Sequence, residues 1–164
     1  MITFGRKLPI GIQTFADIRT QGYLYVDKTA LMWRIANIGK PYFMSRPRRF
    51  GKSLLLSTFE AYFEGRKELF QGLAVEKLEE KWEKHPVLHL DLNAEKYDAP
   101  ERLDAALSYY LTQWEKLYGK GENETTLSNR FKGVIQRAYE QTGKGVVVLV
   151  DEYDKPLLQA LHND

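Results

Sequence analysis

An unbroken run of apolar residues, Val146 to Val150, leads directly into two acidic residues, Asp151 and Glu152. Most of the run is β-branched valine, which is typical of a strand buried on both faces, as in a parallel sheet. Parallel strands need long connections between them, and these are usually helices. The run therefore favours an α/β fold in which strands alternate with helices along the chain.

The rest of the chain supplies both kinds of element. Short apolar segments predict further strands at residues 23–26, 42–45 and 87–93. Helical spacing predicts a helix after Asp27, which is expected to cap it, because a carboxylate accepts hydrogen bonds from the free amides of a first turn. Further helices are predicted at residues 52–63, 101–118 and from 127 to Gly143, and a helical turn followed by a charged amphipathic helix is predicted for residues 67–85.

Length and composition limit the possible classes of protein. The chain of 164 residues suits one domain, and its 24 basic and 22 acidic residues nearly cancel, which argues against a chain-wide attraction to nucleic acid. It contains no cysteine and only three histidines, so disulfides are excluded and an all-protein zinc site is not expected. No apolar run reaches the roughly 18 residues of a membrane span. We therefore expect no membrane partner, and we expect the protein to be cytoplasmic.

A second feature, "SRPRRFGKSLLLS" at residues 45–57, ends like a phosphate-binding loop. In such a loop the backbone amides at a helix start surround a phosphate, a lysine reaches the β- and γ-phosphates, and a hydroxyl binds Mg²⁺. Gly51, Lys52 and Ser53 match these roles. Arg46 stands where the usual G-x-x-x-x-G-K-[ST] pattern has its first glycine, so the alternative is a basic surface loop before an ordinary helix.

The strand that ends in Asp151 supplies the complementary motif. In phosphate-loop enzymes an aspartate at this place holds Mg²⁺, and a neighbouring glutamate can activate the attacking water. Asp151 and Glu152 are the candidates for these two roles, while the alternative is a solvated turn. Because both motifs occur, in the expected order with a strand between them, nucleotide binding is favoured.

Several motifs together resemble the bacterial family called AAA-ATPase-like: "YVDKT", "SRPRRFGKSLLLSTFEAYFEG", "LFQGLAVEK", "HLDLN" and "VVLVDEYDKPL". The loop "RPRRFGKS" is a usual form in that family. The resemblance implies a P-loop NTPase-type three-layer sandwich with a mostly parallel sheet, and it implies ATP and Mg²⁺ as cofactors. It places the nucleotide on a Walker A loop whose residues are Arg46, Pro47, Arg48, Arg49, Phe50, Gly51, Lys52, Ser53 and Leu54. Lys52 and Glu152 are then the catalytic residues, and Ser53 and the Walker B residue Asp151 are the metal ligands.

The resemblance also implies that residues 1–164 are the N-terminal part of a single AAA-ATPase-like domain. Family members are commonly longer and often carry a C-terminal region similar to PD-(D/E)XK nucleases. The Asp-Glu pair resembles a division of P-loop proteins in which a further strand with a polar sensor residue lies between the two motif strands. We therefore expect a sheet that is incomplete at its C-terminal end, and weak or no hydrolysis by this chain alone.

Three functions remain open at this point. The first is an ATP-binding, ATP-hydrolysing Mg²⁺-dependent domain that drives or switches an attached effector region. The second is a nucleotide-binding scaffold without turnover, and the third is a module associated with nucleic acid, either through its own arginines or through the effector. The presence of Glu152 favours the first, because a scaffold does not need a catalytic base.

Some residues have two possible roles. Arg48 and Arg49 can offset charge on the γ-phosphate or form surface ion pairs. Ile10, Gly11 and Phe15 can cover an adenine, as residues before the first core strand often do in AAA-type folds. His89 and Asp91 can support a water network around Mg²⁺ or only make hydrogen bonds with loops. Trp82 and Trp114 are interpreted as core residues because their spacing is helical.

Overall fold

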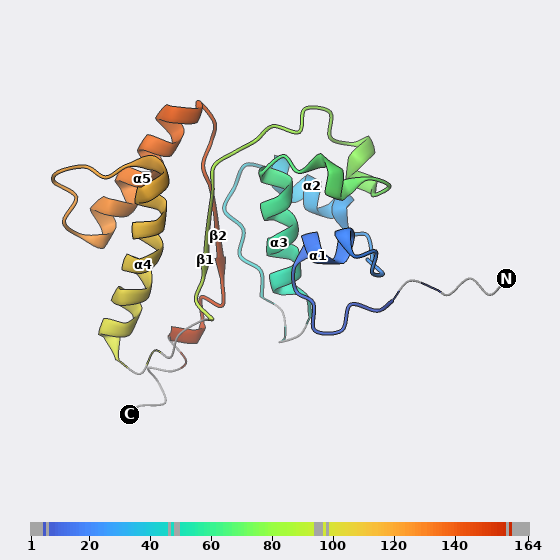
Figure 1. Cartoon of the computed structure of the whole chain (residues 1–164), viewed down its shortest axis with the longest axis horizontal. Helices are drawn as coiled ribbons and strands as arrows, with labels where there is room; N and C mark the ends of the chain where they lie inside the picture. The colour runs from blue at the N-terminus through green and yellow to red at the C-terminus, as the bar shows by residue number, and fades with distance from the viewer. Residues whose placement is uncertain are drawn as a thin grey trace. The chain divides into compact units, whose positions relative to one another are not determined.

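The computed structural model describes residues 5, 7–45, 47, 50–93, 97, 99–156 and 158, which form two compact units. The N-terminal unit, Met1–Lys84, is helical within the described residues, and the C-terminal unit, His85–Asp164, combines helices with a small sheet (Figure 1). The chain is therefore a mixed α/β protein.

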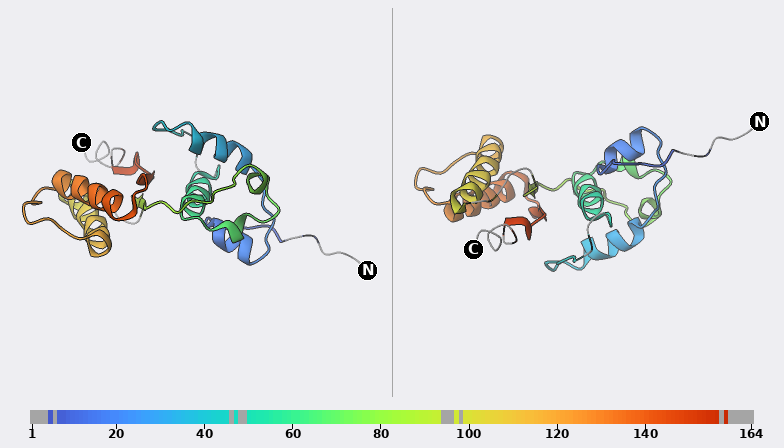
Figure 2. Two further views of the ribbon diagram at one scale, coloured as in Figure 1. Left: turned by 90° about the horizontal axis from the view of Figure 1, so that it is seen from above. Right: turned by 90° about the horizontal axis from the view of Figure 1, so that it is seen from below.

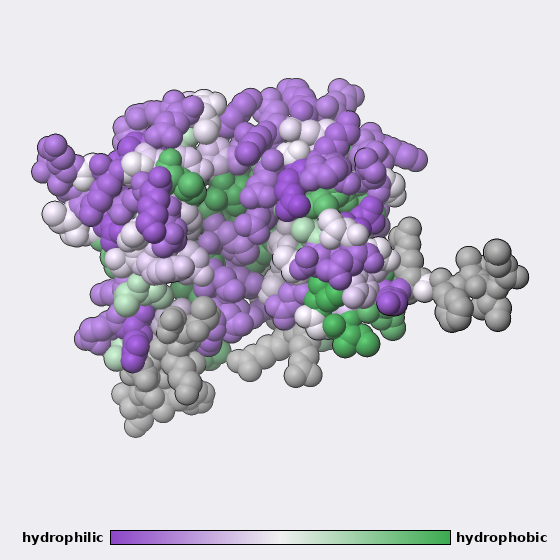
Figure 3. All heavy atoms as spheres, in the orientation of Figure 1, coloured by the Kyte–Doolittle hydropathy of each residue, from purple (hydrophilic) through white to green (hydrophobic). Residues whose placement is uncertain are grey.

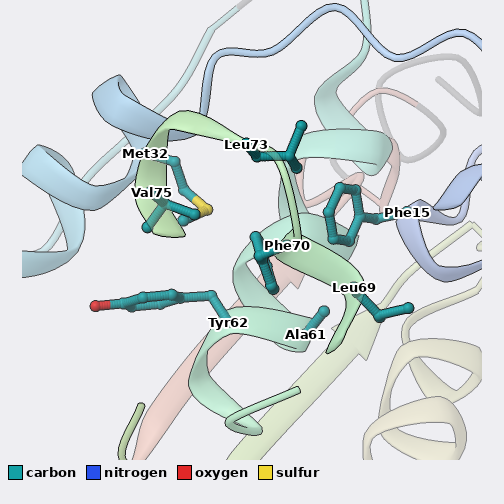
Figure 4. Close-up of a cluster of buried hydrophobic side chains, with 8 residues drawn as sticks. All are labelled: Phe15, Met32, Ala61, Tyr62, Leu69, Phe70, Leu73 and Val75. Atoms are coloured by element: carbon teal, nitrogen blue, oxygen red, sulfur yellow. The ribbon is translucent and has the colours of Figure 1, made fainter. Parts of the chain in front are cut away.

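Three α-helices and two 3₁₀-helices build the N-terminal unit: α1 (Phe15–Thr20), α2 (Thr29–Asn37), α3 (Lys52–Phe63), η1 (Lys67–Phe70) and η2 (Ala74–Lys77). Their apolar side chains meet in one cluster (Figure 4). Its buried members are Phe15, Met32, Ala61, Tyr62, Leu69, Phe70, Leu73 and Val75. Phe15 and Phe70, which are both fully buried, lie with ring centroids 4.8 Å apart. This core fixes the position of α3, which carries the predicted phosphate loop at its start.

Asp27 caps α2 as the sequence predicts, and it also binds a second element. Its carboxylate accepts hydrogen bonds from the Thr29 amide (2.8 Å) and hydroxyl (2.6 Å), and from the Ala74 amide (2.7 Å). The fully buried Thr29 hydroxyl in turn accepts from the Val75 amide at 3.1 Å. One carboxylate and one hydroxyl therefore join α2 to η2.

The amphipathic helix predicted within residues 67–85 does not form. Two 3₁₀-helices stand in its first part, and the chain beyond η2 turns back on itself at Glu79. The Glu79 carboxylate accepts from the amides of Lys81 (2.9 Å) and Trp82 (3.4 Å) and from the indole of Trp33 (3.0 Å), and it also accepts from the hydroxyl of Tyr62. Trp82 has φ 47°, which a right-handed helix does not allow. These tertiary bonds outweigh the helical pattern of the segment.

The C-terminal unit contains the parallel sheet that the valine run predicts. Strand β1 (Val87–Asp91) pairs in parallel with β2 (Val147–Asp151), so that Val87 lies opposite Val147 and Asp91 opposite Asp151. The connection between them holds two long helices, α4 (Pro100–Tyr118) and α5 (Leu127–Thr142). Their predicted spans were 101–118 and 127 to Gly143, so both helices are confirmed.

Helices α4 and α5 lie side by side and pack on β1 (Figures 1 and 2). The buried residues of this core are Leu88, Leu111, Trp114 and Val134. The Thr126 hydroxyl caps α5 by accepting from the Asn129 amide at 3.2 Å, and Gly143 ends the helix with φ 64°. Trp114 is a core residue, as predicted. The core thus holds the sheet so that Asp91 and Asp151 end side by side.

Two strand predictions are wrong for the described residues. Residues 23–26 and 42–45 form no strand, because a strand requires a continuous hydrogen-bonded ladder and only single backbone bonds such as Leu24 N to Lys7 O (2.8 Å) are present. Nor is β2 buried on both faces: Val148 is 41% and Val150 37% exposed. These two side chains share one face of the strand, whereas Leu149 on the opposite face is only 8% exposed.

A buried ion pair joins α4 to α5. The Arg130 guanidinium donates to both carboxylate oxygens of Glu115 (2.7 and 2.8 Å), to the Ser108 hydroxyl (2.8 Å) and to the Thr112 hydroxyl (3.0 Å). The two charged side chains are only 11% and 8% exposed. The hydrogen bond from Arg130 lowers the pKa of Glu115, against the opposing effect of burial.

We expect Arg130→Met to destabilise the protein by about 3 kcal/mol, because it leaves the Glu115 carboxylate buried without a partner. The loss is expected at pH 7 and should shrink as the pH falls, because the buried Glu115 of the variant, without Arg130, becomes protonated first, and the parent loses the pair as the pH passes through its lowered pKa. Urea unfolding at pH 7 and at about pH 3 measures this. The exposed Lys132→Met on α5 serves as control, and an equal effect of both substitutions would contradict the role of the pair.

The surface in Figure 3 is mostly hydrophilic, with separate hydrophobic areas. Among the described residues of the N-terminal unit, the most exposed large apolar side chains are Ile10 (89%), Phe43 (71%), Val26 (70%) and Phe50 (65%). None of the helices in the described part of the chain is long and apolar enough to span a membrane.

Candidate functional site

The predicted phosphate loop ends where α3 begins, in the N-terminal unit. Gly51 is the N-cap of this 12-residue helix and adopts a left-handed conformation, φ 76° and ψ 28°. No side chain of the described residues accepts a hydrogen bond from the first turn. The first amides of a helix have no partner within the helix, and together with the helix dipole they attract anions. The start of α3 can therefore accept a phosphate group.

The backbone conformation at Gly51 favours glycine independently of any ligand. A Cβ built on Gly51 meets no atom of the described residues within 4 Å, so space is not what restricts this position there. What requires glycine is the positive φ, which costs other residues energy.

Lys52 and Ser53 occupy the first two positions of α3 and are partly exposed. Ion pairs among the described residues include Arg66 with Glu68, Arg130 with Glu115 and Arg137 with Glu124, and none of these includes Lys52. Leu54 packs against the core of the unit, so only its backbone remains for a ligand.

The earlier part of the loop is only partly described. The Pro47 carbonyl accepts a bond from the Phe50 amide (3.4 Å), and Phe50 is 65% exposed. Arg46, Arg48 and Arg49 lie outside the described residues, so their predicted contacts with phosphate stay predictions.

The second half of the predicted site lies at the end of β2, in the C-terminal unit. Asp151 is 6% exposed, and its Oδ1 accepts from the Glu152 amide at 2.9 Å. Its carbonyl accepts from the Leu92 amide at 3.2 Å, which extends the pairing beyond β1. Glu152 has φ 52°, a left-handed conformation that is uncommon for a residue with a side chain. Asp151 therefore lies at a hydrogen-bonded strand end, and Glu152 lies in the strained turn that follows it.

This turn contains a third carboxylate and a lysine. One oxygen of Asp154, Oδ1, is buried and accepts no hydrogen bond from the described residues. The Lys155 amide donates to the Glu152 carbonyl at 3.0 Å, and the Lys155 ammonium donates to the carbonyl of Asn93 and to its Oδ1 (3.3 Å). No group of three or more His, Cys, Asp or Glu residues able to hold a metal occurs in the described ranges.

The secondary candidates have different outcomes. Phe15 was predicted as a possible cover for adenine, and this is wrong, because its side chain is fully buried against Tyr25 and Phe70. Ile10 is 89% exposed and stays a candidate. Asp91 accepts from the Asn93 amide at 2.8 Å, which is a contact with its own loop.

Asn93 and Lys155 were not among the predicted site residues, although the structure places both at the strand end with Asp151. Their signal in the sequence was their position within "HLDLN" and "VDEYDKP", each of which contains the end of a strand. Because the carboxyl ends of parallel strands meet at one edge of the sheet, two such motifs are expected to contact each other.

The fold and the two candidate half-sites define a class: a mixed α/β protein with a glycine-initiated helix beginning Lys-Ser and an acidic pair at the end of a parallel strand. A family model described as "Predicted AAA-ATPase" matches residues 9–164. The chain belongs to this family of predicted AAA-ATPases, which confirms the resemblance at the level of the family.

A curated relative comes from Azotobacter chroococcum mcd 1 and is described as an uncharacterized protein in the vnfD 5' region. It is 43% identical over 160 residues, which cover 95% of this chain and 30% of the relative. The chain thus spans less than a third of that protein. No solved structure matches the chain.

Proposed function

We propose that this chain is an ATP-binding and ATP-hydrolysing P-loop domain of the three-layer type that drives or switches an attached effector region. The observation that carries the proposal is the start of α3. There a left-handed glycine leads directly into Lys52 and Ser53, and no described side chain satisfies the first-turn amides. The family, whose members are described as predicted AAA-ATPases, supports the nucleotide theme.

In this proposal residues 46–54 bind the phosphates. The amides at the start of α3 donate to phosphate oxygens, and the helix dipole adds to the attraction. The Lys52 ammonium, which has no carboxylate partner among the described residues, donates a charge-assisted hydrogen bond to the β- and γ-phosphates. Arg46, Arg48 and Arg49 add positive charge to the loop.

The residues at the end of β2 fit a divalent cation. Mg²⁺ prefers oxygen ligands, keeps several waters and uses one or two carboxylates plus phosphates, so a cluster of three protein ligands is not required. Asp151 would hold it together with the Ser53 hydroxyl. The buried Oδ1 of Asp154, which lacks a donor, supports a cation or its water at this turn, because such an atom is costly to leave unsatisfied. When bound, Mg²⁺ neutralises charge on the phosphate oxygens.

Glu152 is proposed as the general base. It follows the residue proposed to hold the cation and stands in a turn whose backbone is fixed, so its carboxylate can orient a water and accept its proton. The attached effector is proposed to lie in a region such as the remaining 70% of the relative, which the chain does not cover. A nuclease-like region there would bring nucleic acid as a partner.

The alternative is a scaffold that binds nucleotide without turnover. The strained conformation of Glu152 favours hydrolysis over this alternative, because strain of this kind is retained mainly at functional sites. A role for the chain itself in binding nucleic acid is less well supported, since its net charge is only +2.

Asp151→Asn is expected to weaken Mg²⁺-dependent ATP binding by about tenfold or more, because the amide lacks the charge that holds the cation. The substitution keeps the oxygen that accepts from the Glu152 amide, so the fold should persist. Titration of labelled ATP with Mg²⁺ and with EDTA measures the effect, and the exposed Asp104→Asn on α4 is the control. Equal Mg²⁺ dependence in both variants would remove Asp151 as a metal ligand.

A further inference from the structure

We infer that Lys155 is a positioning residue for the proposed ATPase site, because it ties the turn that carries Glu152 to the loop after β1. The inference rests on the proposed function. Lys155 contacts neither phosphate nor water in this assignment and acts through the backbone of Glu152. Its partner is Asn93, 62 residues away in the sequence.

The turn is held at both ends. At its start, the Asp151 carbonyl accepts from the Leu92 amide and the Asp151 carboxylate accepts from the Glu152 amide. At its end, the Lys155 amide donates to the Glu152 carbonyl, while the Lys155 ammonium donates to the Asn93 carbonyl and side chain. Glu152 is therefore enclosed between two fixed points.

The anchor on the β1 side is itself supported. The Asn93 amide donates to Asp91 Oδ1 at 2.8 Å, and the Tyr110 hydroxyl of α4 donates to the Asp91 carbonyl at 2.8 Å. Hydrogen bonds therefore run without a break from Tyr110 of α4, through Asp91 and Asn93 at the end of β1, to Lys155 in the turn after β2. Lys155 provides a side-chain link between the loop after β1 and the turn after β2.

The strain at Glu152 explains why such a link is needed. A residue with a side chain stays in a left-handed conformation only when its surroundings hold it there. Without the Lys155 ammonium, the turn keeps its bonds at Asp151 but loses this anchor at its far end, and Glu152 can then relax to a negative φ. Relaxation would move its carboxylate from the position of a base while leaving the phosphate loop and Asp151 unchanged.

The test compares Lys155→Met with the parent and with Lys132→Met, an exposed lysine on α5 of the same unit, all in the full-length protein. Methionine keeps the apolar stem and removes the ammonium. We expect kcat for Mg-ATP hydrolysis to fall by about ten- to a hundredfold with the dissociation constant for ATP unchanged, because misplaced catalytic groups cost rate. Without nucleotide, amide exchange at Glu152 and Tyr153 should become faster. Asn93→Ala, which leaves the Asn93 carbonyl, should have a smaller effect in the same direction.

Four outcomes are distinguishable. Faster exchange with lower kcat and unchanged ATP affinity supports the inference. Unchanged exchange and unchanged kcat in Lys155→Met overturn it, while an active parent leaves the proposed function intact. A parent without ATPase activity contradicts the proposed function, and faster exchange in the variant would then still support the tie itself. Equal loss of ATP affinity and kcat would overturn the positioning role in favour of a general structural one.

Discussion

Lys52→Ala is expected to reduce Mg-ATP binding by at least about a hundredfold, because a hydrogen bond to a charged group of about 3 kcal/mol is lost from the phosphates. The side chain at this position makes no ion pair within the described residues, so little of the folded structure depends on it. The melting temperature without nucleotide should therefore stay close to that of the parent. Equilibrium binding of labelled ATP, with a thermal melt beside it, gives both quantities.

Lys77→Ala is the matched control, since Lys77 is an exposed lysine of the same unit at the end of η2. It removes the same charge from the unit without touching the start of α3. If Lys52→Ala binds ATP as tightly as Lys77→Ala does, the phosphate assignment of the loop is wrong.

Glu152→Gln is expected to leave Mg-ATP binding intact and to slow hydrolysis by about a hundredfold or more in the full-length protein, as loss of a general base does. Glutamine has nearly the same shape and can occupy the same turn, so the effect isolates the proton acceptor. Single-turnover hydrolysis, measured beside equilibrium binding, separates the chemical step from affinity.

The neighbouring acidic residue provides the comparison for this experiment. Asp151→Asn should lower affinity through Mg²⁺, whereas Glu152→Gln should lower the rate alone. Undiminished turnover in Glu152→Gln would exclude Glu152 as the base, whereas ATP binding without any turnover in the parent would favour the scaffold alternative.

Local signals in the sequence were enough to predict the helices that frame both half-sites. The glycine before Lys52 gives the start of α3, and the glycine at 143 gives the end of α5. Asp27 is a cap for the reason the sequence indicated, although its bond to Ala74 depends on a contact 47 residues away. Where an element depends on capping and periodicity, the sequence predicts it well.

Some elements that depend on distant partners were predicted wrongly. The region after η2 has a helical pattern, but Glu79 collects hydrogen bonds from Trp33, Tyr62 and two nearby amides, and these bonds turn the chain. The segments at 23–26 and 42–45 have strand-like composition without a ladder. Local sequence patterns do not show where a distant hydrogen-bond partner lies, and in these segments that partner determines whether the helix or strand forms.

For the candidate site, the sequence predicted which residues are present better than it predicted the backbone conformation and the contacts that hold them. It identified Gly51, Lys52, Asp151 and Glu152, and their roles stay predictions until nucleotide binding is measured. It did not reveal that Glu152 has a positive φ or that Lys155 reaches Asn93. The contact between Lys155 and Asn93 follows from the parallel register, which brings the ends of the two strands together.

The central proposal is that the start of α3 and the end of β2 each take part in binding Mg-ATP. Amide hydrogen exchange of the full-length protein, with and without Mg-ATP, tests it most directly. We predict that Mg-ATP slows exchange in residues 50–55 and in residues 151–155 together, and that Lys52→Ala abolishes both effects. Slower exchange in only one segment, or in neither at saturating Mg-ATP, would contradict the claim.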